Sequence, residues 1–101
     1  MQSIGDTLRK LREEKQLPLR KVAALLDIDT SLLSKIERNE RQANRQQIVQ
    51  LAKIYEVKES QLLVEYFSDI VAYEIAEEET AKQILQVAEE KVKYQKTKKK
   101  K

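Results

Sequence analysis

Residues 19–38 contain the pattern that most restricts how this chain folds, because two short amphipathic helical segments meet there across a very tight turn. The apolar stripes of the two segments run through Val22, Ala23, Leu25 and Leu26 and then through Leu33 and Ile36. Asp27 lies where the turn requires a positive φ, and Asp29 is placed to cap the second segment with its carboxylate. Two helices that share a core across so short a connection predict a helix-turn-helix.

The second segment presents a mixed polar face on the side opposite its apolar stripe. This face consists of Thr30, Ser31, Leu32, Ser34, Lys35 and Arg38. The major groove of B-DNA accepts one α-helix and presents donors, acceptors and methyl groups that side chains of these types can read. The alternative interpretation is an ordinary helical hairpin with a solvated outer face, because polar outer faces are common.

Four sequence blocks between Leu8 and Leu63 favour the first interpretation. The blocks are LRKLREEKQL at 8–17, VAALLDI at 22–28, SKIERNER at 34–41 and LAKIYEVKESQLL at 51–63. In order and spacing they resemble the Cro/lambda-repressor family of DNA-binding domains, in the form often called XRE-type regulators. The resemblance implies a globule of five helices whose third is the recognition helix. It also implies a structural ion pair between Arg12 and Glu37.

The chain departs from the family pattern at the start of the second helix and at two turns. The family commonly begins that helix with Ser-Gln, whose Gln binds a phosphate, whereas this chain has Pro18 and Leu19. We therefore expect that phosphate contact to be missing, although Pro is acceptable in the first turn of a helix. Asp27 and Asn39 replace the glycines after the second and third helices, and both residue types accept positive φ.

The matching motif also implies which side chains contact DNA. Base-edge reading is expected from Thr30, Ser31, Leu32 and Lys35. Within this set, Lys35 should favour a guanine through its O6 and N7 atoms, and Leu32 should contact a thymine methyl. Phosphate binding is expected from Arg38, Arg41, Asn44 and Arg45. The alternative for the phosphate set is that these are ordinary solvent-facing side chains.

Charge is distributed very unevenly along the chain, although its total is only +3. Residues 1–58 carry 12 Lys or Arg against 8 Asp or Glu, which gives +4, and residues 59–90 carry 1 against 9, which gives −8. Residues 91–101 carry 7 Lys and no acidic residue, which gives +7. Because phosphates attract basic segments and repel acidic ones, only the first and last segments should approach DNA.

Hydrophobic periodicity predicts helices at about 3–15, 19–26, 30–38, 45–55, 59–76 and 81–96. Ser3 and the pair Asn44 and Gln47 supply plausible N-terminal caps for the first and fourth helices. The fold class is therefore all-α, with a five-helix lambda-repressor-like DNA-binding head and an additional C-terminal helical extension. The expected divisions are residues 1–67 for the head, 68–96 for the extension and 97–101 for a disordered lysine tail.

The extension carries more apolar surface than one small head needs. Its apolar residues form two groups: Tyr66, Phe67, Ile70 and Val71, and then Ile84, Leu85, Ala88 and Val92. We expect these residues to pack on a second copy of the chain, because a symmetric pair buries the surplus and doubles the DNA contacts. The alternative is that the last helix folds back on its own head.

Composition argues against an enzyme and for an intracellular protein. The chain has neither His nor Cys, which removes the usual general base near neutral pH, the usual thiol nucleophile and the commonest transition-metal ligands. No glycine-rich phosphate loop is present, and no apolar run approaches the roughly 20 residues that span a bilayer. We expect no cofactor, no metal, no membrane association and a cytoplasmic location.

The sequence therefore predicts a sequence-specific DNA-binding transcriptional regulator that binds a palindromic operator in double-stranded DNA as a homodimer. Its small size and lack of a ligand domain resemble the controller proteins of restriction-modification systems. One alternative is an antitoxin-like protein whose C-terminal extension binds and neutralises a partner protein. Another is a helical adaptor without any role on DNA.

Overall fold

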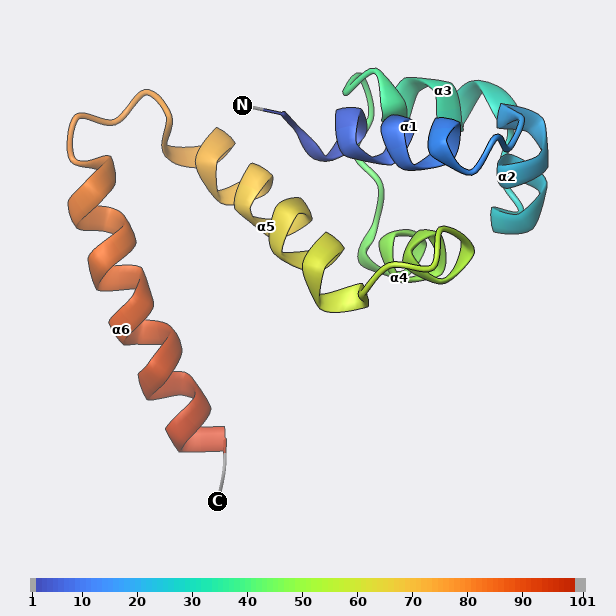
Figure 1. The fold of residues 1–101 in the computed structure, drawn as a ribbon. Coiled ribbons are helices and arrows are strands. Elements are labelled where there is room, and N and C mark those ends of the chain that lie inside the picture. The colour runs from blue at the N-terminus through green and yellow to red at the C-terminus, as the bar shows by residue number, and fades with distance from the viewer. Residues whose placement is uncertain (1, 100–101) are drawn as a thin grey trace. The chain divides into compact units, whose positions relative to one another are not determined.

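The computed structural model describes residues 2–99, which form six α-helices and no strand, so the all-α prediction is confirmed (Figure 1). The helices are α1 (Ile4–Glu14), α2 (Leu19–Leu26), α3 (Thr30–Glu37), α4 (Arg45–Ile54), α5 (Glu59–Ile75) and α6 (Ala81–Lys99). Within these residues the chain divides into two compact units between Ile70 and Val71, three residues after the expected boundary. We refer to residues 2–70 as the N-terminal unit and to residues 71–99 as the C-terminal unit.

Local side-chain chemistry defines the starts of α1 and α4. At α4, the Asn44 side chain accepts a hydrogen bond from the Gln47 amide at 2.8 Å, and the Asn44 amide donates to Gln47 Oε1 at 2.9 Å. At α1, the Ser3 amide donates to the Asp6 carboxylate at 3.3 Å. Asp29 precedes α3, but its side chain makes no capping hydrogen bond, so the predicted contact is absent.

Each of the first four helices is followed by a non-glycine residue with positive φ. These residues are Gln16, Asp27, Asn39 and Glu56, with φ between 55° and 63°. Asp27 and Asn39 agree with the sequence prediction, since Asp and Asn tolerate this conformation. Gln and Glu give no such local signal. The chain therefore turns tightly after each of these four helices, which allows the helices of the N-terminal unit to pack around one core.

The core of the N-terminal unit is formed by side chains from all five of its helices and from the loop before α4. Its buried members are Leu8, Val22, Ala23, Leu26, Leu33, Ile36, Ala43, Ile48, Leu51, Ala52, Tyr55, Leu62 and Tyr66. Leu25, which we expected in the stripe of α2, is 56% exposed and lies outside this core. Tyr66, which we expected on a surface for a second copy, is buried, and its hydroxyl donates to the Ala43 carbonyl at 2.7 Å.

The C-terminal unit has no buried residue among positions 71–98, where side-chain exposure is described. Its exposed large apolar side chains are Val71, Tyr73, Ile84, Leu85, Val87, Val92 and Tyr94. The helix α6 runs three residues beyond the predicted end at residue 96, into the segment expected to be disordered. Lysine is a good helix former and no Gly or Pro interrupts the segment. Lys100 and Lys101 of the expected tail lie outside the described residues.

None of the helices in residues 2–99 combines the length and the apolar character needed to cross a membrane.

Candidate nucleic-acid interface

The turn between α2 and α3 orients α3 and exposes its first turn. Asp27 has φ 59° and ψ 46°, and the Ile28 amide donates to the Ala23 carbonyl at 3.0 Å. The apolar side of α3 then points into the core through Leu33 and Ile36, which are 0% and 3% exposed. Because an α-helix that buries one side must present the other, the opposite face of α3 lies at the surface.

Three of the four expected base-reading side chains lie on this exposed face. Thr30 and Ser31 occupy the first turn of α3, and Lys35 follows one turn later; all three are exposed. Leu32 differs, because it is half-buried and packs against the core. Only part of the Leu32 side chain is therefore available for a thymine methyl.

The C-terminal end of α3 is joined to α1 by a shielded ion pair. Arg12 Nε lies 2.7 Å from Glu37 Oε2, and Arg12 Nη2 donates to Glu37 Oε1 at 3.0 Å, so the pair is bidentate. Arg12 Nη1 also donates to the Leu17 carbonyl at 3.0 Å. The hydrogen bond to Glu37 raises the pKa of Arg12 above its ordinary value. Glu37 is 4% exposed at its side chain, which makes this pair part of the core.

Tyr55, the residue directly after α4, lies close enough to this ion pair for both of its charges to act on the phenol. Its side chain is buried, and its hydroxyl has no hydrogen-bond partner within the described residues. Burial raises the pKa of Tyr55, and the negative charge of Glu37 raises it further. The phenol therefore remains neutral and contributes apolar packing around the charged pair.

The four expected phosphate-binding residues occupy one continuous stretch from the end of α3 to the start of α4. Arg38, Arg41, Asn44 and Arg45 are all exposed. Arg38 Nη2 lies 3.5 Å from Glu40 Oε1, and Arg38 Nε lies 3.4 Å from the Ser34 carbonyl. The oxygen of the Asn44 side chain is used for capping, which leaves its amide nitrogen to donate to a ligand.

At the start of α2, Pro18 is the residue before the helix and Leu19 is its first residue. Leu19 is half-buried against the core and has no polar side-chain atom. The start of α2 therefore offers no side-chain donor at these two positions, and the missing phosphate contact stays a prediction.

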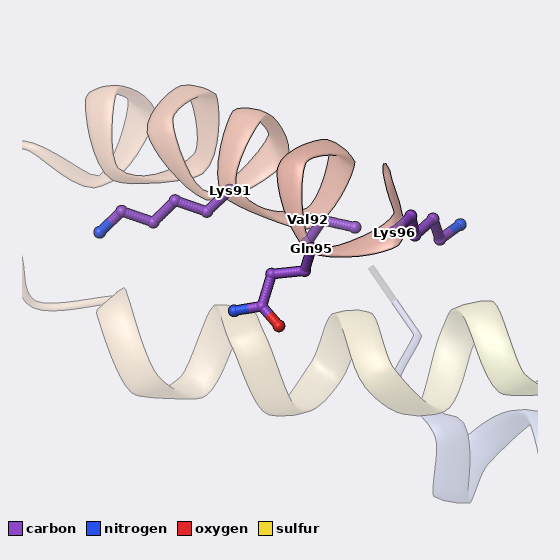
Figure 2. A pocket seen from close by; sticks show the side chains of 4 residues that line it. All are labelled: Lys91, Val92, Gln95 and Lys96. Carbon is purple, nitrogen blue, oxygen red and sulfur yellow. The ribbon is translucent and has the colours of Figure 1, made fainter. Parts of the chain in front are cut away.

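The surface of α6 has a shallow depression lined by Lys91, Val92, Gln95 and Lys96, whose side chains are shown in Figure 2. All four residues are exposed. They supply two ammonium groups and one amide, but no carboxylate, hydroxyl or thiol. Among the described residues, no group of three or more His, Cys, Asp or Glu could hold a metal ion.

Comparison with known proteins supports the interpretation of α2 and α3. A family model described as a helix-turn-helix domain matches residues 3–63. Among solved structures, the clp gene regulator ClgR from Corynebacterium glutamicum is similar, with a TM-score of 0.57 and 22% sequence identity. The likeness covers 84% of this chain and 88% of that chain, and at this identity it concerns the fold. No curated protein matches the chain.

Proposed function

Because this chain belongs to the helix-turn-helix domain family, in its XRE-like form, we propose that it is a sequence-specific DNA-binding transcriptional regulator that binds a palindromic operator as a homodimer. The observation that carries the proposal is the exposed face of α3. Thr30, Ser31 and Lys35 are exposed on a helix whose other side is fixed in the core. A rigidly held helix with hydroxyl and cationic groups in its first two turns suits the major groove.

In this proposal the side chains at the interface divide into two roles. Thr30, Ser31 and Lys35 read base edges, and Lys35 favours guanine because its ammonium group donates to O6 and N7. Arg38, Arg41, Asn44 and Arg45 bind phosphates and set the register of α3 in the groove. Leu32 contributes less than the sequence suggested, because it is half-buried.

The apolar surface of α5 supports the homodimer. Val64, Phe67 and Val71 follow one another at spacings of three and four residues, and they are 68%, 45% and 43% exposed. Of the residues expected at the dimer interface, Tyr66 is buried in its own head and Ile70 packs partly against the core. In the proposed interface we therefore keep Phe67 and Val71 and replace Tyr66 and Ile70 by Val64. The α6 contribution stays with Ile84, Leu85, Ala88 and Val92.

The mechanism in this proposal is occupancy, in which a dimer bound at a promoter blocks or recruits polymerase. Two recognition helices then enter successive major grooves about 34–36 Å apart. A more specific form of this proposal is a role as the controller of a restriction-modification system. A neighbouring gene for a methyltransferase or a nuclease would support that role.

The exposed apolar residues of the C-terminal unit also suit a second function. An antitoxin-like protein would use them to bind and neutralise a partner protein, while the N-terminal unit binds DNA. A small toxin gene beside this gene, with a product that the purified full chain retains, would favour this alternative.

Selection of bound sequences from a random pool of double-stranded DNA tests the main proposal. We expect a palindromic motif with one fixed spacing. Lys35→Ala should change the preferred sequence and weaken binding at the selected site by about 1–3 kcal/mol. Arg41→Ala is the matched control. It should weaken binding to all DNA sequences alike and reduce the number of ions released on binding by about one, as measured from the salt dependence of the affinity. An absence of any selected motif would refute sequence-specific binding.

Truncation after Ile70 tests the homodimer. The shortened chain keeps every residue of the buried core but loses α6 and Val71. We expect the full chain to sediment as a dimer and the shortened chain to associate more weakly, with lower affinity for the selected operator. A full chain that sediments as a monomer, unchanged by truncation, would contradict the proposed dimer.

A further inference from the structure

The first turn of α1 is hydrogen-bonded on two sides by residues from distant parts of the N-terminal unit. The Ile4 amide donates to Asp69 Oδ2 of α5 at 2.6 Å. The next amide, that of Gly5, donates at 3.1 Å to Oδ1 of Asn39, the second residue after α3. The first amides of a helix have no partner within the helix, and here two consecutive ones are used to join α1 to two other elements.

The recognition helix α3 is held to α1 at two points, and the two helices lie alongside each other (Figure 1). One point is the ion pair of Glu37 with Arg12, and the other is the hydrogen bond of Asn39 with Gly5. Gly5 is required for this approach, because a Cβ atom there would lie only 2.6 Å from the Ile36 carbonyl oxygen. The end of α3 and the start of α1 are thus in backbone contact and should move together.

The helix α5 is also held to α1 at two points. Besides the bond from Ile4 to Asp69, the Thr7 hydroxyl donates to Glu65 Oε1 at 2.7 Å. Glu65 and Asp69 are one helical turn apart and share the face of α5 that carries the buried Leu62 and Tyr66. Val64, Phe67 and Val71 lie on the other side of the same helix.

We propose that α1 is the element that fixes the recognition helix relative to the dimerisation helix, with Asp69, Glu65 and Thr7 as positioning residues. The proposal rests on the proposed function, because it assumes that α5 meets a second copy and that α3 enters DNA. In such a dimer, the position of α3 relative to α5 determines the distance between the two recognition helices. These three side chains therefore set the preferred spacing of the half-sites without contacting DNA.

Charge explains why carboxylates serve this purpose. The positive end of the α1 dipole is at its first turn, so a carboxylate such as that of Asp69 is a stronger acceptor for the Ile4 amide than an uncharged group would be. A strong contact is needed because a small rotation of α5 displaces α3 in both halves of the dimer.

Selection with variable spacers tests the proposal in the full chain. A pool is built from two selected half-sites separated by spacers of different lengths. Asp69→Ala should reduce the preference for the best spacing by about 2- to 30-fold and leave the half-site sequence unchanged. Asp69→Asn keeps an acceptor oxygen but loses the charge, so it should retain part of the preference and fall between the parent and Asp69→Ala. Glu59→Ala, an exposed α5 carboxylate with the same change of charge, is the control and should have no effect.

A distance measurement that needs neither DNA nor a dimer separates this inference from the proposed function. The chain has no cysteine, so Lys35→Cys on α3 and Gln61→Cys on α5 introduce two unique sites for spin labels. In chains diluted with unlabelled protein, we expect one narrow distance distribution, which broadens or shifts when Asp69→Ala is added. Thr7→Val is a milder variant for the same purpose if Asp69→Ala does not fold.

The outcomes of the two experiments decide between the possibilities. An unchanged label distance, or an unchanged spacing preference in a folded dimeric Asp69→Ala chain, would overturn the positioning role and leave the proposed function intact. A parent chain that selects no DNA would overturn the proposed function and, with it, the role of α1 in half-site spacing.

Discussion

The N-terminal and C-terminal units both contain helices with apolar side chains gathered on one side, but only the N-terminal unit buries them. In the N-terminal unit, α2, α3 and α4 bury their apolar stripes in one core, whereas α6 has no buried side chain among the residues with described exposure. Ile84, Leu85, Ala88 and Val92 share one side of α6, although apolar and polar residues are less sharply separated over that helix than over α2, α3 and α4. An amphipathic pattern therefore predicts that a face will be covered, but it does not identify what covers it.

The largest expected difference between the units is in how much a leucine-to-alanine substitution lowers the free energy of unfolding. Leu51 is 0% exposed and Leu85 is 48% exposed. Leu51→Ala should lower the free energy of unfolding by about 2–5 kcal/mol, because it leaves a cavity in the core. Leu85→Ala should change it by about 0.5 kcal/mol or less in the monomer.

Urea unfolding followed by the near-ultraviolet circular dichroism of the buried tyrosines measures both values. A large destabilisation by Leu85→Ala in chains too dilute to associate would show that α6 packs on its own N-terminal unit. That result would remove the contrast between the two units.

A second comparison concerns one ion pair in each unit. Glu37→Gln leaves the shielded Arg12 without its charged partner and should destabilise the protein by about 3 kcal/mol. Glu89→Gln in α6 removes an exposed pair with Lys93 whose charged atoms are 3.9 Å apart, and it should cost about 0.3–0.5 kcal/mol. Chemical denaturation of both variants checks the ranking, and equal effects would contradict the shielding of Arg12.

The close approach of α1 to α3 provides a third test. Gly5→Ala should destabilise the N-terminal unit by about 1–3 kcal/mol, since the added methyl meets Asn39 Oδ1 and the Ile36 carbonyl oxygen. Adding Asn39→Gly removes the first of these obstacles and suits the positive φ of 63° at that position. The double variant should therefore recover part of the lost stability in thermal unfolding. A Gly5→Ala variant as stable as the parent would show that α1 and α3 have room to separate.

The smallest expected effect is a pH dependence at the surface of the N-terminal unit. The hydrogen bond from Lys15 lowers the pKa of Glu56 below its ordinary value of 4.5. Because the folded-state pKa is the lower one, the stabilisation is present above pH 4.5 and is lost as the pH falls through the folded-state value. Chemical denaturation at several pH values should show that the free energy of unfolding decreases slightly less toward acid pH for Glu56→Gln than for the parent chain. Identical profiles for parent and variant would mean that this exposed pair contributes nothing.

The sequence by itself determined the positions of the six helices, the tight turn at Asp27 and the cap formed by Asn44 and Gln47. It also placed Thr30, Ser31 and Lys35 opposite the buried side of α3. These features depend on residues within a few positions of one another, where periodicity and capping chemistry act directly.

Only the tertiary structure decided which apolar residues are buried and which polar groups meet. Tyr66 proved to be a core residue because the Ala43 carbonyl lies within reach of its hydroxyl, and Leu25 proved to be exposed. The contact of Ile4 with Asp69 joins residues 65 positions apart. Such contacts depend on how helices pack against one another, and a local pattern contains no information about the partner that completes them.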